Sequence, residues 1–286
     1  NDRVIPPEFC SAPWKLLHIS PQGEVHSCYE SLVSLGNVNE RSLEEIWQGD
    51  AFVALRQKML AGERVSACEK CHIKADAIEG RSLRTLTNEQ TGGVEASRKL
   101  IEAAALKPEL APEILDLSFS NGCNLKCRMC SSVYSKSWID DEVALYEKSH
   151  GQAREIGETQ LREQIFPLLK KSVKKLLLAG GEPILDRKNK LLLRFLIDSG
   201  RTDMTLEYNT NGTILDAETL ALWKSFPNLR LAISVDSSGK RFEYLRKGAR
   251  WSRIIENVAK LRDEAPHATL ACYSTISIFN VLTHPD

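Results

Sequence analysis

The sequence carries no net charge and no long apolar run. Its 286 residues include 38 Lys and Arg against 38 Asp and Glu, so no overall field draws the chain to nucleic acid or to an anionic lipid surface. No apolar run approaches the ~18 residues of a membrane-spanning helix, and residues 1–7 lack the pattern of a signal peptide. We therefore expect a cytoplasmic protein with small or peptidic partners, and without nucleic acid or membrane partners.

Cysteine is the residue type that stands out. Seven of the eight cysteines fall at spacings typical of metal ligands, which in a chain of this length favours bound metal over a disulfide framework. The eighth, Cys272, lies in the apolar run 271–276, where we expect a small buried core residue.

Cys123, Cys127 and Cys130 form a CxxxCxxC motif directly after the apolar segment 114–119. Three thiolates can hold a four-iron cluster and leave one iron without a protein ligand, so that this iron can bind a substrate or cofactor. A zinc ion with a fourth ligand elsewhere in the chain is the alternative.

The motif resembles the signature of the radical S-adenosylmethionine (SAM) superfamily, where it lies in the loop after the first strand of a partial barrel. The resemblance implies that SAM chelates the open iron of a 4Fe-4S cluster. It also implies that one electron from the cluster cleaves SAM to methionine and a 5'-deoxyadenosyl radical, which abstracts hydrogen from a substrate.

Strand-like and helix-like segments alternate after residue 112, which predicts an α/β fold with a parallel sheet. The expected strands are residues 114–119, 173–178, 204–208, 229–235 and 268–278. The expected helices are residues 134–147, 190–199, 217–225 and 251–261. The resemblance implies a partial (β/α)6 barrel, and we expect its sixth strand to lie outside this chain.

Segment 179–183, Ala-Gly-Gly-Glu-Pro, follows the second expected strand. Paired glycines let the backbone approach a ligand, although alone they could form an ordinary turn. The segment is similar to the GGEP motif of the family, which implies that Gly180, Gly181, Glu182 and Pro183 lie at the SAM amino group.

The ends of the third and fourth expected strands add candidates for holding SAM. Thr210 and Asn211 resemble a Thr-Asn-Gly segment near SAM in related enzymes, or form an ordinary Asn-Gly turn. Ser234 and Asp236 suit ribose hydroxyls, unless Asp236 caps the next helix. Arg246 is the candidate for the SAM carboxylate, unless it is a surface residue.

Two apolar side chains are candidates for packing against adenine. Met129 stands where the family usually has an aromatic residue, and its thioether can take that place. Ile278 lies near the end of the fifth expected strand, where it can equally be a core residue.

The N-terminal part carries a second cysteine set, formed by Cys10, Cys28, Cys68 and Cys71. Four thiolates can close an iron–sulfur cluster or bind a structural zinc ion. We expect a hairpin over residues 15–27 to bring the first two together. Two helices, with N-caps at Ser42 and Asp50, should deliver the other two.

Residues 9–84 resemble the twitch domain, a shortened SPASM domain, which implies an auxiliary 4Fe-4S cluster. The match extends to segments 35–37, 42–47, 55–56 and 59–62. Such a domain usually follows the barrel, whereas here it precedes it. Cys68, Cys71 and His72 also spell the haem-attachment motif CxxCH, but haem would leave the other two cysteines without a role.

These features predict three regions. Residues 1–84 form the auxiliary-cluster domain, residues 85–112 a linker with a helix at 94–106, and residues 113–286 the radical SAM core. The resemblance implies an oxidoreductase that modifies a peptide or protein side chain, and a reductase or a flavodoxin- or ferredoxin-type electron donor. No catalytic acid or base can be identified. The alternative is an iron–sulfur electron-transfer or scaffold protein that does not cleave SAM.

Overall fold

The computed structural model describes residues 5–31, 33–77, 82–152 and 154–282. Its internal contacts divide the chain into two compact units. Unit 1 consists of the residues up to Ile19, Gly23–Asp116 and Gln160–Val173. Unit 2 consists of Ser20–Gln22, Leu117–Thr159 and the residues from Lys174 onward. Across the described residues, no helix combines the length and the apolar composition needed to cross a membrane.

Unit 1 opens with a short helix and an antiparallel hairpin. These elements are α1 (Ala12–Lys15), β1 (Leu16–Ile19), β2 (Glu24–His26) and β3 (Gly36–Asn37). β1 and β2 are antiparallel, with His18 opposite His26, and β3 continues the arrangement beside β2. The hairpin expected from the sequence is confirmed.

The rest of unit 1 is helical. Its elements are α2 (Leu43–Trp47), α3 (Asp50–Ala61), the 3-10 turn η1 (Ser66–Cys68), α4 (Glu69–Ala77), α5 (Leu83–Gln90), α6 (Gly93–Ala103), η4 (Leu161–Ile165) and α9 (Phe166–Lys171). Ser42 forms the predicted capping box with Glu45. The predicted cap of α3 is wrong by one residue, since Gly49 is the N-cap and Asp50 the first helical residue, where its charge still favours the helix N-terminus.

Arg56 on α3 is fully buried in the core of unit 1. Its Nε donates to the Pro13 carbonyl at 3.0 Å, and its Nη1 donates to the carbonyls of Trp47 at 2.7 Å and Leu106 at 2.9 Å. The guanidinium also lies 4.5 Å from the centroid of the Trp47 ring. Burial lowers the pKa of Arg56 to about 10. One side chain therefore joins three segments that are distant in the sequence.

Replacing Arg56 with Met should destabilise unit 1 by about 3 kcal/mol, because three carbonyls, two of them buried, would lose a charged donor. Urea unfolding measures the change. Arg98→Met on α6 is the matched control, since Arg98 is exposed, and it should change stability by less than about 0.5 kcal/mol. Equal midpoints for the two variants would contradict this prediction.

Unit 2 is built on parallel strands. They are β6 (Lys175–Ala179), β7 (Thr205–Thr210), β8 (Leu229–Ser234) and β10 (Thr269–Tyr273), adjacent in that order. Each neighbouring pair is parallel. β4 (Ile114–Ser118) passes from unit 1 to unit 2 after Asp116. The α/β architecture expected from the sequence, a partial barrel with parallel strands, is confirmed.

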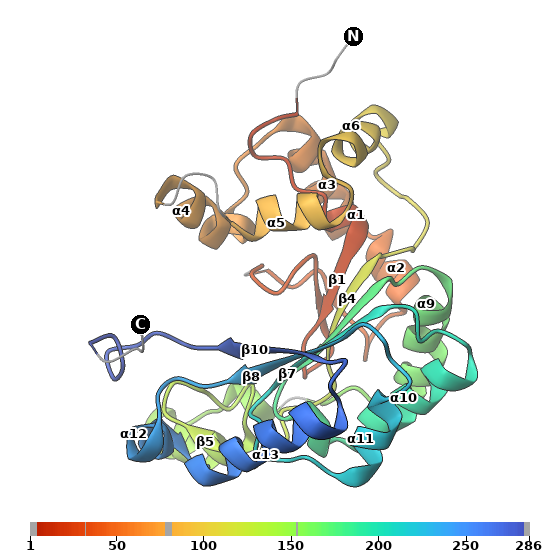
Figure 1. The fold of residues 1–286 in the computed structure, drawn as a ribbon. Coiled ribbons are helices and arrows are strands. Elements are labelled where there is room, and N and C mark those ends of the chain that lie inside the picture. The colour runs from red at the N-terminus through yellow and green to blue at the C-terminus, as the bar shows by residue number, and fades with distance from the viewer. Residues whose placement is uncertain (1–4, 32, 78–81, 153, 283–286) are drawn as a thin grey trace. The chain divides into compact units, whose positions relative to one another are not determined.

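Helices connect successive strands of unit 2. α10 (Arg187–Asp198), α11 (Ala217–Trp223) and α13 (Trp251–Glu264) lie on one side of the strands (Figure 1). Leu176, Leu206 and Leu231 are fully buried, as the alternation of side chains along a half-covered strand predicts. The remaining elements are β5 (Lys126–Cys127), η2 (Lys136–Trp138), α7 (Ile139–Tyr146), η3 (His150–Gln152), α8 (Glu158–Gln160), η5 (Pro183–Leu185), α12 (Gly239–Leu245) and β9 (Arg246–Lys247).

The last strand differs from its prediction. β10 ends at Tyr273 instead of residue 278. It is an edge strand and pairs with β8 alone among the described strands, so its side chains are covered less than those of the inner strands. Cys272 is consequently exposed, and the prediction of a buried core residue there is wrong.

Candidate functional site

The three cysteines of the CxxxCxxC motif lie on one loop of unit 2. Cys127 is held by the antiparallel pairing of β5 with β9, in which it faces Arg246, and the Cys130 amide donates to the Cys127 carbonyl at 3.1 Å. Burial raises the pKa of all three thiols, that of Cys127 to about 11. Neutral thiols are therefore favoured without a bound cation, and iron would stabilise the thiolates.

The GGEP segment packs directly on this loop. The Gly181 amide donates to the Ser120 carbonyl at 3.0 Å, and the Glu182 amide donates to the Gly122 carbonyl at 2.8 Å. A Cβ on Gly181 would lie 2.2 Å from the Gly122 oxygen, and Gly180 has a φ of 109°. Only glycines allow this approach of two backbones.

Glu182 links the end of β6 to the end of β7. Its carboxylate accepts hydrogen bonds from the Thr210 hydroxyl at 2.8 Å and the Asn211 amide at 2.7 Å. Burial raises the pKa of Glu182 to about 7, although these hydrogen bonds act in the opposite direction. The Glu182 carboxylate therefore holds the GGEP segment against the end of β7, while the Glu182 amide holds the same segment against the cysteine loop.

Asn211 extends the contact to the cysteines. Its Nδ2 donates to Asn124 Oδ1 at 2.9 Å and lies 3.8 Å from Cys123 Sγ. Gly212 has a φ of 71°, as an Asn-Gly turn requires. The Asn-Gly turn is therefore present, and it lies beside the cysteine loop.

Asp236 and Arg246 form a buried ion pair. The Arg246 Nε lies 2.7 Å from Asp236 Oδ2, and its Nη1 lies 3.9 Å from Cys127 Sγ. Asp236 also accepts a hydrogen bond from the Thr275 amide at 2.8 Å. Arg246 is thus not a surface residue, and Asp236 does not cap the next helix, whose N-cap is Ser238.

The other candidate SAM-binding residues are only half-buried or are exposed. Ser234 is the last residue of β8 and is half-buried, and Asp236 lies two residues beyond the end of that strand. Met129 is half-buried within the cysteine loop. Ile278 lies in a turn after β10 and is 87% exposed, so it packs against little of unit 2.

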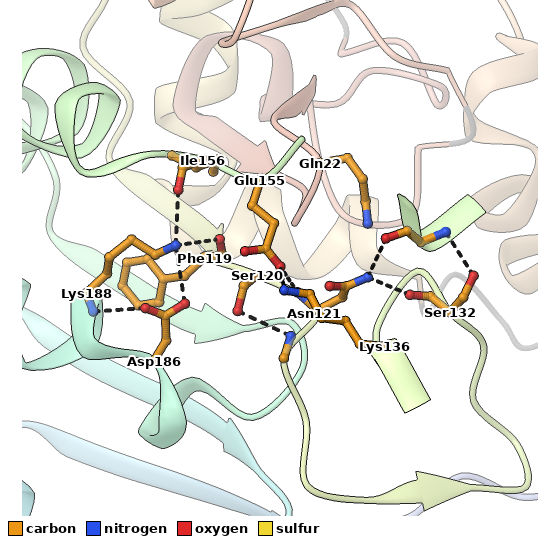
Figure 2. Close-up of polar contacts among 12 residues, drawn as sticks. Gln22, Phe119, Ser120, Asn121, Ser132, Lys136, Glu155, Ile156, Asp186 and Lys188 are labelled. Carbon is orange, nitrogen blue, oxygen red and sulfur yellow. Dashed lines mark hydrogen bonds and ion pairs between the residues drawn. The ribbon is translucent and has the colours of Figure 1, made fainter. Parts of the chain in front are cut away.

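Asn121, which the sequence analysis did not single out, closes the base of the cysteine loop. It is fully buried, and its Nδ2 donates to the carbonyls of Ser132 at 2.7 Å and Gly151 at 2.9 Å (Figure 2). Its backbone carbonyl accepts from the Lys136 amide at 2.9 Å. The side chain and the backbone of this one residue therefore hold both ends of the loop. Its position next to the motif was the only signal in the sequence.

Lys188 anchors the segment that precedes the loop. Its Nζ donates to the carbonyls of Phe119 at 3.3 Å and Ile156 at 3.0 Å, and pairs with Asp186 at 3.3 Å (Figure 2). The sequence contained no signal for this role, because a lysine in the first turn of a helix is usually exposed.

The second cysteine set surrounds a pocket in unit 1. The pocket has a volume of about 390 Å³, counting the part open to solvent, and is lined by Cys10, Cys28, Cys68 and Cys71. Burial raises the pKa of each of the first three thiols, to about 12 for Cys28 and about 11 for Cys68, and neighbouring thiols add to the rise. Within the described ranges, no three His, Cys, Asp or Glu side chains form a single-ion site.

Three polar side chains also line this pocket. Glu8 pairs with Arg84 and lies 2.9 Å from His72 Nδ1. The His72 Nε2 is buried and has no hydrogen-bond partner among the described residues. A group that binds four thiolates fits the pocket, and an iron–sulfur cluster meets this requirement.

Comparison with known families gives two matches. Residues 117–284 match the radical SAM superfamily, and residues 10–72 match SPASM, an iron–sulfur cluster-binding domain. The SPASM match precedes the radical SAM match in the chain. No curated protein matches.

Several solved structures are similar at low identity. SuiB from Streptococcus suis bound to S-adenosylmethionine is 16% identical, with 78% of this chain and 50% of that chain covered and a TM-score of 0.45. SuiB bound to its precursor peptide SuiA is 15% identical, with 78% and 51% covered and a TM-score of 0.45. Native anSMEcpe with bound AdoMet is 17% identical, with 56% of this chain and 43% of that chain covered and a TM-score of 0.41. The chain thus spans about half the length of these proteins.

Proposed function

The chain belongs to the radical SAM superfamily, and we propose that it cleaves SAM reductively and abstracts a hydrogen atom from a substrate. When bound, a 4Fe-4S cluster supplies the electron and SAM supplies the 5'-deoxyadenosyl radical. Cys123, Cys127 and Cys130 are the proposed ligands of that cluster. The electron-transfer alternative requires the same cysteines but no pocket for SAM.

One observation carries the proposal: the GGEP segment is hydrogen bonded to the loop that holds the three cysteines. The contact between the Glu182 amide and the Gly122 carbonyl, at 2.8 Å, supports a ligand site beside the cysteines. We assign the backbone around Gly180 and Gly181 to the SAM amino group. A pure electron carrier would gain nothing from this contact.

The polar residues at the other strand ends are proposed to hold the rest of SAM. Asp236 and Ser234 would face the ribose hydroxyls, and Thr210 and Asn211 would hold the segment beside them. Arg246 remains the candidate for the SAM carboxylate. Because its Nε pairs with Asp236, the contact would use the guanidinium N–H groups that face the cysteine loop.

We propose a second 4Fe-4S cluster on Cys10, Cys28, Cys68 and Cys71, supported by the SPASM match and the shared pocket. Four thiolates leave no iron open, so this cluster would move electrons or support the fold. An electron acceptor suits a net oxidation, in which the substrate loses a hydrogen atom, a proton and an electron. A peptide or protein side chain is the proposed substrate, because barrels with such domains often modify peptides.

Anaerobic reconstitution with iron and sulfide tests the two cofactors. The intact chain should bind about eight irons, and a variant with Cys123, Cys127 and Cys130 replaced by Ala should bind about four. A variant with Cys10, Cys28, Cys68 and Cys71 replaced by Ala should likewise bind about four irons. Zinc in either set, or about four irons in the intact chain, would contradict the two-cluster proposal.

A further inference from the structure

Arg246 contacts Cys127 as well as Asp236. Cys127 and Arg246 face each other in the antiparallel pair of β5 and β9. The Arg246 Nη1 group donates to Cys127 Sγ at 3.9 Å, and the contact is buried. A cysteine sulfur is a weak acceptor, but a charge in a buried site is screened less than a charge at the surface. The proposed iron ligand Cys127 therefore has a positive charge fixed beside its sulfur.

The sulfur atoms of the cysteine loop receive donors of different strength. Cys123 Sγ accepts from the Leu125 amide at 3.4 Å and from Asn211 Nδ2 at 3.8 Å. Both of these donors are neutral, whereas the donor to Cys127 Sγ carries a full charge. Hydrogen bonds from charged donors are roughly twice as strong as those from neutral donors. Arg246 is thus the donor with the largest expected effect on a ligand sulfur in the described part of the chain.

Asp236 fixes the position of the Arg246 guanidinium. Its side chain is fully buried, Oδ2 lies 2.7 Å from Arg246 Nε, and Oδ1 accepts from the Thr275 amide at 2.8 Å. The Asp236 carbonyl accepts from Asn280 Nδ2 at 3.0 Å. With Nε beside Asp236 and Nη1 beside Cys127, Nη2 can serve the SAM carboxylate assigned above.

We infer that Arg246, positioned by Asp236, donates an N–H···S hydrogen bond to the Cys127 ligand of the SAM-binding cluster and thereby raises the reduction potential of that cluster. This inference rests on the cluster proposed above. The reduced cluster carries one more negative charge than the oxidised cluster, so a positive donor at a ligand sulfur stabilises the reduced form more. Burial raises the pKa of Cys127, and the Arg246 charge acts in the opposite direction, which is the same preference for negative charge on sulfur. Arg246 thus sets the potential at which the cluster accepts the electron that precedes SAM cleavage.

The test is a redox titration of the reconstituted intact chain with dithionite, followed by electron paramagnetic resonance in the absence of SAM. The signal of the SAM-binding cluster is the one that disappears when Cys123, Cys127 and Cys130 are replaced by Ala. The signal that remains belongs to the N-terminal cluster and serves as an internal control. Omitting SAM separates an effect on the cluster from an effect on SAM binding.

Asp236→Asn and the double variant Asp236→Asn/Arg246→Gln form a matched pair, because the double variant removes both charges and leaves no buried charge unpaired. Asp236→Asn should raise the ratio of reduced to oxidised SAM-binding cluster at a fixed solution potential by about threefold, since a nearby negative charge is lost. Relative to Asp236→Asn, the double variant should lower this ratio about tenfold, which is about 59 mV. Arg246→Lys keeps the charge and should retain most of the ratio of the intact chain. Arg250→Gln is the control, because Arg250 is an exposed residue at the start of α13, and it should leave the ratio unchanged.

Shifts of opposite sign would distinguish an effect of charge from a general loosening of the loop, which would move both variants in one direction. Equal potentials for Asp236→Asn and the double variant would overturn the inference, while the cluster itself would stand. An equal fall in Arg250→Gln, or in the signal of the N-terminal cluster, would overturn it as well. An intact chain without any signal that depends on the three cysteines would instead refute the proposed SAM-binding cluster.

A measurement on the intact chain keeps the inference testable if the variants lose their cluster. Protein made with arginine that carries nitrogen-15 in its guanidinium group should show a weak nitrogen-15 coupling in pulsed electron paramagnetic resonance of the SAM-binding cluster. Arg128→Lys should retain this coupling, because the Arg128 guanidinium lies 3.9 Å from the centroid of the Tyr244 ring and its Nε donates to the Tyr244 carbonyl. Absence of the coupling, or its loss in Arg128→Lys, would overturn the hydrogen bond from Arg246.

Discussion

Anaerobically reconstituted protein with dithionite is expected to convert SAM to 5'-deoxyadenosine, and Cys127→Ala should reduce the yield on the order of 100-fold or more. The single variant should lose as much as a variant without all three cysteines, because residues that act as a unit are not additive. Cys127 is the best single target, since its thiol is buried and faces Arg246 across the β5–β9 pair. Chromatography of the quenched reaction measures the product.

Cys272→Ala is the matched control for this experiment. Cys272 is an exposed thiol in the same unit and lies outside both cysteine sets, so its loss should leave the yield unchanged. Product formation by Cys127→Ala would contradict the assignment of the ligands. No product from intact protein with its full iron content would favour the electron-transfer alternative.

Gly181→Ala should destabilise unit 2 by about 3 kcal/mol and abolish SAM binding. The new Cβ would lie 2.2 Å from the Gly122 oxygen. That oxygen belongs to the backbone, and no side-chain torsion can move a Cβ away from it. Moving the segment would break the hydrogen bonds of Gly181 and Glu182 to the cysteine loop. The melting temperature should fall by about 6–12 °C, and equilibrium dialysis should show the loss of SAM binding.

Gly200→Ala separates the clash from the general cost of replacing a glycine. Gly200 has a φ of 70°, but a Cβ there would meet nothing within 4 Å. The control should cost about 1 kcal/mol through backbone strain alone and retain SAM binding. If Gly181→Ala were no more damaging than this control, the close packing of GGEP on the loop would not be needed for the site.

The local features of both cysteine regions could be predicted from the sequence. Short-range chemistry determines the Ser42 capping box and the hairpin of β1 and β2, and both are confirmed. The strands and helices of unit 2 follow from alternating and helical apolar patterns, which are strong in buried α/β segments. Those patterns weaken at the edge of a sheet. The predicted end of β10 and the predicted burial of Cys272 were wrong for this reason.

The contacts that complete the two candidate sites could not be predicted in this way. α5 is polar and short, yet it places Arg84 against the N-terminal pocket. The pairing of Asp236 with Arg246 and the hydrogen bonds of Asn121 join residues through tertiary structure. Sequence periodicity reports which face of an element is buried, but it carries no information about which polar groups meet there.

The last stretch of unit 1, Gln160–Val173, is separated in the chain from the rest of that unit by part of unit 2, and this bears on how the protein matures. This stretch is attached by a hydrogen bond from the Leu43 amide to Gln164 at 2.9 Å and from the Ser172 hydroxyl to the Pro112 carbonyl at 2.9 Å. Residues leave the ribosome from the N-terminus onward, so these bonds form only after residue 173 has been made. The four N-terminal thiols are therefore translated early, but the unit that holds them is completed only after more than half of the chain has been made.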